Sequence, residues 1–342
     1  EQWHKNGEKV ILIREETSPE DVHGMHAAEA ILTAKGGMTS HAALVARGWG
    51  KCCIVGCSEL QIDVSKKEVL IGENTISEGD WITMNGTEGR IYAGAVKLID
   101  ADPDTHPEYK ELMVWADEVR QLKIRTNAES PNDAKQAIKF GAEGIGLCRT
   151  EHMFFDEARI LAIRKMIFAD NEKDRRSAVM ELLPYQKEDF MGILNAMEGM
   201  PVTIRLLDPP LHEFMSLSED QEKSLADNLN IDVSTVKNRV SALHELNPML
   251  GHRGCRLGIA YPEITEMQAR AILEAAAELT KSGVSVLPEI MIPLVGTVTE
   301  YIDQEKVIRE VAKDVMKEHD LELKFMVGTM IELPRACLTA DE

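Results

Sequence analysis

One histidine, His41, lies in the segment whose residue types are best suited to chemistry. The apolar run 31–34 predicts a short strand, and the glycine pair 36–37 ends it before Thr39 or Ser40, either of which can cap a following helix. His41 would then lie in the first helical turn, where backbone N–H groups and the helix dipole favour an anion. This pattern suits a histidine that accepts a phosphoryl group, although a lone histidine after a glycine turn is more often an ordinary polar residue.

Four charged residues farther along the chain lie close to the ends of predicted strands. Arg149 follows one strand, Arg205 lies in the next, Arg253 precedes a third, and Glu332 follows the last. Parallel α/β enzymes place their chemistry at strand ends, arginine forks match phosphate and carboxylate oxygens, and a carboxylate can hold Mg²⁺. Together the four suit an anion such as phosphoenolpyruvate with one divalent ion, whereas each arginine alone is more simply explained by a salt bridge.

The elements expected around His41 form one compact α/β module. Its strands are predicted at residues 9–13, 31–34, 52–56, 69–71, 81–84 and 90–92. We therefore expect a first domain over residues 1–100. The polar, proline-containing stretch after it has no apolar period and predicts a linker, which we place at 101–118.

After the linker, predicted strands and helices alternate. Six strands are expected at 122–126, 144–148, 202–207, 255–259, 287–292 and 325–331, with helices at 263–281 and about 300–318 and a mostly helical insertion at 217–246. This alternation predicts a (β/α) barrel or an open doubly wound sheet over 119–342. A closed eight-stranded barrel needs two more strands, and the chain does not begin with Met, so we expect a fragment whose barrel is truncated at its C-terminal end.

Composition limits the classes of function. The 342 residues carry a formal net charge of −20, which argues against nucleic-acid or membrane-surface binding, because both need a basic face. No apolar run approaches the ~18 residues of a membrane-spanning helix, and the first residues do not resemble a signal peptide. The six cysteines lack metal-binding spacing and predict reduced thiols. We expect a soluble, intracellular protein of the cytoplasm, with an organelle such as the chloroplast or glycosome as the alternative.

Four segments resemble one enzyme family. The string Gly-Gly-Met-Thr-Ser-His-Ala-Ala at 36–43 resembles the phosphohistidine signature of the pyruvate, phosphate dikinases, and 146–154, 205–214 and 251–257 resemble barrel motifs of the same family in the same order. The related phosphoenolpyruvate synthases and Enzyme I of the sugar phosphotransferase system have similar histidine segments. Met38 and the cysteine pair that follows at 52–53 look more like the dikinases.

The resemblance implies a fold and a reaction. It implies an α/β protein in which a swivelling β/β/α phosphohistidine domain is followed by an incomplete (β/α)8 TIM-type barrel that binds phosphoenolpyruvate or pyruvate. It also implies a phosphotransferase that interconverts ATP, phosphate and pyruvate with AMP, pyrophosphate and phosphoenolpyruvate. The intact enzyme would use Mg²⁺ as cofactor and form a homodimer through the barrel, with no nucleic-acid or membrane partner.

The same resemblance assigns roles to particular residues. His41 would carry the phosphoryl group, and Arg149 and Arg205 would bind the phosphate and carboxylate region of phosphoenolpyruvate. Arg253 would line the same pocket, and Glu332 would be one of two carboxylate ligands to Mg²⁺.

The resemblance also implies that Thr39 corresponds to a regulatory phosphorylation site of plant-type members. A phosphate dianion on Thr39 would lie beside His41 and would repel an incoming phosphoryl group. A helix cap is the simpler interpretation of this threonine.

Several parts of the family are expected to lie outside this sequence. They are the nucleotide-binding domain, the second metal-binding carboxylate and the general-acid cysteine, so the chain is expected to be inactive alone. We interpret its own Cys148 and Cys255 as packing residues. Two alternatives remain open: a phosphoenolpyruvate synthase, which uses water in place of phosphate, and a non-catalytic phosphocarrier module.

Overall fold

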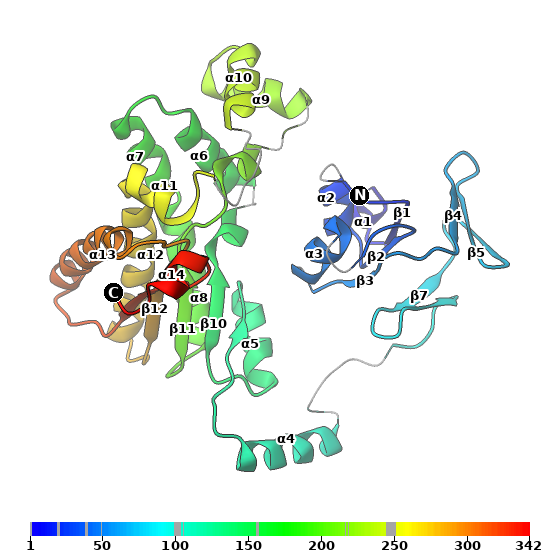
Figure 1. Cartoon of the computed structure of the whole chain (residues 1–342), viewed down its shortest axis with the longest axis horizontal. Coiled ribbons are helices and arrows are strands. Elements are labelled where there is room, and N and C mark those ends of the chain that lie inside the picture. Colours follow the sequence, from blue (N-terminus) through cyan, green and yellow to red (C-terminus); the bar gives the residue numbers. More distant parts are fainter. Residues whose placement is uncertain are drawn as a thin grey trace. The chain divides into compact units, whose positions relative to one another are not determined.

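The computed structural model divides into two compact units, Glu1–Ala101 and Asp102–Glu342 (Figure 1). It describes residues 2–18, 21–37, 40–48, 50–98, 104, 106–154, 157–215, 217, 219–243 and 251–342. Thr39, singled out in the sequence as a regulatory candidate, lies outside the described residues. Within the described ranges, none of the helices combines the length and the apolar composition needed to cross a bilayer.

The first unit combines a parallel and an antiparallel part. Its elements are α1 (Gln2–Lys5), β1 (Ile11–Arg14), α2 (Val22–Ala27), β2 (Ala30–Thr33), α3 (His41–Gly48), β3 (Cys52–Ile54), β4 (Leu60–Asp63), β5 (Glu68–Ile71), β6 (Asn74–Ser77), β7 (Ile82–Asn85) and β8 (Arg90–Ala93). Strands β1, β2 and β3 form a parallel sheet in that order, β4, β5 and β6 an antiparallel one, and β7 pairs with β8.

Strand β2 is buried on both faces and organises the core of this unit. Successive strand residues point to opposite faces, so neighbours on β2 enter different clusters. Ile31 packs with buried residues of α2 and α3, among them Met25 and Ala46, whereas Leu32 packs with Leu60 and the partly buried side chains of the antiparallel strands. The parallel sheet is therefore covered by helices on one face and by β structure on the other.

The second unit is built on one parallel sheet. Its elements are α4 (Pro107–Val119), β9 (Thr126–Asn127), α5 (Pro131–Lys139), β10 (Ile145–Arg149), η3 (Thr150–Phe154), α6 (Glu157–Phe168), α7 (Glu172–Met180), α8 (Leu183–Ala196), β11 (Pro201–Arg205), η4 (Leu211–Met215), α9 (Glu219–Leu229), α10 (Val233–Leu243), α11 (Gly254–Ala260), α12 (Pro262–Lys281), β12 (Leu287–Ile292), α13 (Val298–His319), β13 (Met326–Thr329) and α14 (Pro334–Leu338). The five strands run in the order β13-β12-β11-β10-β9, each parallel to its neighbour.

The main core of this unit lies between the sheet and three helices. Buried residues of β10, β11 and β12 pack with α8, α12 and α13, which lie along the sheet (Figure 1). Helix α12 is the centre of this layer and presents several alanines to its neighbours, which allows the close approach of α8 and α13. Helices α12 and α13 confirm the two long helices predicted here, and α9 and α10 confirm the helical insertion.

The strand predicted at 255–259 is wrong, because these residues belong to helix α11. The alternation of apolar residues there fits a strand, but the buried positions are Gly254, Cys255, Leu257 and Gly258, which have the i, i+3, i+4 spacing of a helix, and Ile259 is 41% exposed. A Cβ atom at Gly258 would lie 2.3 Å from Oε1 of Gln304, so glycine lets α11 pack closely against α13. Strand β11 pairs directly with β12, and the sheet has five strands where six were predicted.

Helix α4 begins inside the stretch predicted as the linker. Pro107 occupies its first turn and Glu108 supplies an acidic side chain there, both of which favour a helix start. None of its residues is buried.

A buried ion pair ties helix α7 to helix α12. Arg175 is paired with Glu263, whose side chain is 1% exposed, and its guanidinium stacks on the Tyr261 ring at 4.2 Å. Arg175→Met should lower the free energy of unfolding by about 3 kcal/mol, because it leaves a buried carboxylate uncompensated. Urea titration followed by circular dichroism measures this. Lys165→Ala is the control, because it breaks a more exposed ion pair, with Glu181, and should lower the free energy of unfolding by less than about 1 kcal/mol.

The partner substitution provides the check on this prediction. Adding Glu263→Leu to Arg175→Met should recover most of the loss, because the second change removes the unpaired charge. A double variant no more stable than the single one would show that the ion pair is not the cause.

Candidate functional site

Two of the predicted arginines lie side by side at the carboxyl edge of the parallel sheet. Arg149 ends β10, Arg205 ends β11, and the two are register partners. Nη1 of Arg149 donates to Oε1 of Glu129 at 2.7 Å, and about a third of the Arg149 side chain is exposed. Both arginines thus end neighbouring parallel strands at the edge where α/β enzymes place their chemistry, and one ligand there could contact both.

Arg205 is the buried centre of this edge. Its side chain is 10% exposed, and it is ion-paired with Glu151 through Nη2 and with Oδ2 of Asp208 through Nη1 at 2.9 Å. Two carboxylates offset the cost of burying one guanidinium. Within the described ranges, Nε of Arg205 and Oε2 of Glu151 are buried and have no hydrogen-bond partner. These two atoms can therefore still form hydrogen bonds with a bound ligand or water.

Arg253 reaches the same cluster from the residue just before helix α11. Its Nη2 donates to Oδ2 of Asp208 at 2.7 Å, so one carboxylate oxygen holds both Arg205 and Arg253. Gly254 follows with φ of +57°, and a Cβ atom there would lie 2.7 Å from Cβ of Leu294. Glycine is therefore required at 254 for the chain to bring Arg253 into the site.

Glu332 follows β13, and its Oε1 accepts a 2.8 Å hydrogen bond from the backbone N–H of Leu294. The side chain is exposed and can offer a carboxylate oxygen to a cation. Mg²⁺ takes about six oxygen ligands, and the part of the chain that the structure describes contains no group of three or more His, Cys, Asp or Glu residues able to hold a metal. These residues alone do not fit a complete magnesium site.

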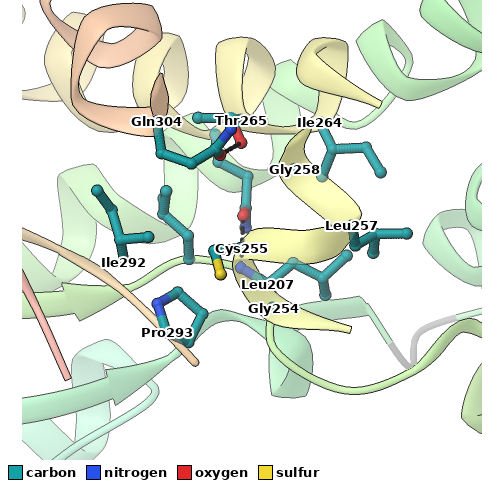
Figure 2. A pocket seen from close by; sticks show the side chains of 12 residues that line it. Leu207, Gly254, Cys255, Leu257, Gly258, Ile264, Thr265, Ile292, Pro293 and Gln304 are labelled. Carbon is teal, nitrogen blue, oxygen red and sulfur yellow. Dashed lines mark hydrogen bonds between the residues drawn. The ribbon is translucent and has the colours of Figure 1, made fainter. Parts of the chain in front are cut away.

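The two cysteines near this edge are packing residues, as the sequence analysis proposed. Cys148 and Cys255 are both buried in the main core. Burial raises the pKa of the Cys148 thiol far above its usual value and that of Cys255 to about 11. Cys255 also borders a cavity of about 10 Å³, which is close to the volume that one water molecule needs, so the cavity admits no organic ligand (Figure 2).

In the first unit, His41 begins helix α3, as predicted. Ser40 acts as the cap, because its Oγ accepts from the backbone N–H of Ala43 at 3.5 Å and its carbonyl accepts from Leu44 at 3.0 Å. Nδ1 of His41 lies 3.2 Å from Oγ1 of Thr17, a residue that is 6% exposed. The imidazole therefore has one nitrogen engaged by a buried hydroxyl at a helix N-terminus.

The turn before α3 depends on two glycines. Gly36 has φ of +106°, and Gly56 has φ of +69° and comes so close that its Cβ would lie 2.6 Å from the carbonyl oxygen of Gly36. Gly37 differs from both, because a Cβ there would meet nothing within 4 Å. Packing in the described structure thus requires glycine at positions 36 and 56. At position 37 it does not, because the space where a side chain would begin is empty of described atoms.

The sequence analysis missed four residues whose side chains contact the predicted ones, namely Glu129, Glu151, Asp208 and Thr17. Glu151 and Asp208 each lie two or three residues beyond a predicted arginine, at strand ends where acidic side chains could have been considered. Thr17 gave no signal, because it lies 24 positions before His41 and only the fold brings them together.

Comparison with known families assigns nearly the whole chain. Residues 6–89 match the family described as "PEP-utilising enzyme, mobile domain", and residues 104–342 match "PEP-utilising enzyme, PEP-binding domain". His41 lies in the first region, and the three arginines and Glu332 lie in the second.

Similar proteins come from distant organisms. The chain is 57% identical over 344 residues to "Pyruvate, phosphate dikinase 1, chloroplastic" of Arabidopsis thaliana, which covers 100% of this chain and 36% of that protein. It is 52% identical to "Pyruvate, phosphate dikinase" of Clostridium symbiosum and 55% identical to that of Giardia intestinalis, covering 99% of this chain in both cases and 39% and 38% of those proteins. The chain thus spans a little over a third of the length of these relatives.

Proposed function

Because this chain belongs to the family of PEP-utilising enzymes, we propose that it forms the phosphohistidine and phosphoenolpyruvate-binding part of a pyruvate, phosphate dikinase. The reaction is the interconversion of ATP, phosphate and pyruvate with AMP, pyrophosphate and phosphoenolpyruvate. Under this proposal, the first unit is a swivelling carrier domain, and the five-stranded sheet is part of a (β/α)8 barrel.

The convergence of three arginines at one sheet edge carries the proposal. Arg149 and Arg205 end neighbouring strands, and Asp208 holds Arg253 against Arg205. Guanidinium groups in fixed positions suit the phosphate and carboxylate of phosphoenolpyruvate, and they stabilise the charge on phosphoryl oxygens during transfer. Their carboxylate partners keep the guanidinium groups oriented before a ligand arrives.

His41 would act as the nucleophile through Nε2. If Nδ1–H donates to Oγ1 of Thr17, the lone pair lies on Nε2 and can attack the phosphorus atom. With phosphoenolpyruvate as donor, the P–O bond breaks as the P–N bond forms, and the pyruvate enolate leaves and takes up a proton. The open side of Gly37 supports the approach of a bulky phosphoryl group to the start of α3.

Glu332 is proposed as one carboxylate ligand of Mg²⁺. Its hydrogen bond to the backbone of Leu294 fixes one oxygen, and the ion, when bound, would neutralise charge on the substrate.

Thr17→Val should slow phosphorylation of His41 by about tenfold, because it removes the acceptor that sets the imidazole tautomer while keeping the shape of the side chain. Thr17→Ser retains the hydroxyl and should restore most of the rate. Quenched-flow measurement of phosphohistidine in the full-length gene product checks this, and equal rates for valine and serine variants would contradict the assigned tautomer.

The reaction itself is tested by supplying the full-length gene product with ATP and pyruvate, with and without phosphate. The dikinase proposal predicts that AMP formation requires phosphate and yields pyrophosphate. AMP formation without added phosphate and without pyrophosphate would identify a phosphoenolpyruvate synthase instead.

A further inference from the structure

The carboxamide of Gln268, on helix α12, joins the two segments that carry the carboxylates of Arg205. Its Oε1 accepts from the backbone N–H of Leu207 at 2.7 Å, a bond drawn in Figure 2, and its Nε2 donates to Oγ1 of Thr150 at 2.9 Å. Because a backbone N–H can only donate, the orientation of this amide is fixed by chemistry. Nε2 also lies 3.4 Å from Oε1 of Gln186.

The two bonded positions directly precede the carboxylates. Glu151 follows Thr150, and Asp208 follows Leu207. Arg205 is ion-paired with both carboxylates. The contacts therefore close a ring, in which the amide of α12 joins the two segments on one side and the guanidinium joins them on the other.

Solvent cannot replace this amide. Gln268 and Thr150 are both 0% exposed, so a lost bond leaves a buried polar group unsatisfied. The neighbouring cavity in Figure 2 admits no more than one water molecule, and it is lined by Leu207 but not by Thr150, so a water there would contact one segment only. The distance between the two carboxylates thus depends on the carboxamide itself.

We propose that Gln268 is a positioning residue of the anion site. By fixing the spacing between the segments after β10 and β11, it holds Glu151 and Asp208 where they orient Arg205. Gln268 acts through these carboxylates and does not touch the ligand. The inference rests on the proposed function in one respect, that the ligand of Arg205 is phosphoenolpyruvate.

The first test needs no ligand. In ¹⁵N spectra of the folded 342-residue chain, the guanidinium signals of Arg205, assigned through Arg205→Lys, should be resolved by slow rotation. Gln268→Leu should average or shift them, whereas Gln304→Leu should leave them unchanged. Gln304 is the matched control, because it is equally buried on α13 and bonds to Thr265 rather than to either segment. Wild-type Arg205 signals in Gln268→Leu would overturn the proposal.

The second test measures phosphoenolpyruvate binding by calorimetry. Gln268→Leu should raise Kd about tenfold, while Gln304→Leu stays within about twofold. Thr150→Val, which has the shape of threonine, makes the same test if Gln268→Leu does not fold, and Thr150→Ser should restore binding. Equal affinity in the Gln268, Thr150 and Gln304 variants would overturn the inference. The calorimetry uses the full-length gene product. Wild-type full-length protein that binds no phosphoenolpyruvate would contradict the proposed function, while the spectra would still decide the role of Gln268.

Discussion

Replacing His41 with alanine is expected to abolish phosphoryl transfer to and from phosphoenolpyruvate, by at least about 10³-fold, while the chain remains folded. The reason is that the imidazole supplies the bond-forming nitrogen, and no other group can take its place in the transfer. Steady-state kinetics of the full-length gene product measures the effect, and circular dichroism confirms the fold.

His4→Ala is the matched control for this variant. His4 is an exposed histidine of the same unit, so its removal should leave the rate unchanged. If His41→Ala kept more than about a tenth of the wild-type rate, the phosphocarrier role of His41 would be wrong.

Arg205→Lys should lower the rate of His41 phosphorylation by phosphoenolpyruvate about 10²-fold and spare phosphorylation from ATP and phosphate. Lysine keeps the positive charge that Glu151 and Asp208 require but lacks the planar fork, so the site stays folded without its bidentate geometry. Measuring the two half-reactions separately by radiolabel transfer gives the comparison.

The control for Arg205 is Arg176→Lys on α7, an arginine that pairs with Glu266 away from the sheet edge. This variant should change neither half-reaction. A loss of both half-reactions in Arg205→Lys, with the fold intact, would contradict the assignment of Arg205 to phosphoenolpyruvate alone.

The sequence predicted the parallel sheet well where strands are apolar and β-branched. The runs around Ile145, Val202, Ile290 and Val327 became β10, β11, β12 and β13, because such runs satisfy both local propensity and burial. The prediction of a strand at 255–259 was wrong, since apolar residues that alternate over only five positions fit a strand or a short helix, and packing of Gly258 against α13 decides between them.

Polar strands escaped prediction. Strand β6 has an exposed, largely polar sequence, and its pairing with β5 rather than its own residues makes it a strand. Strand β4 alternates apolar and polar residues, and Leu60 packs in the core. It was not predicted, because its four residues give a weaker strand pattern than the predicted strands at 52–56 and 69–71 on either side.

In the candidate site, too, some residues could be predicted from the sequence and others could not. Arginines at strand ends can be read from the sequence, because strand and residue type are both local properties. The partners that orient them cannot, since Gln268 reaches Leu207 across 61 positions and Thr17 reaches His41 across 24. These contacts exist only after packing has brought distant segments together.

The most direct test of the account is to look for phosphate on His41. The chain is incubated with Mg²⁺, phosphoenolpyruvate and a complete barrel domain of a relative, and its intact mass is measured under alkaline conditions. The account predicts one acid-labile phosphate, absent from His41→Ala. A folded chain that gains no phosphate, while the same barrel phosphorylates its own carrier domain, would contradict the claim that His41 is a phosphoryl carrier.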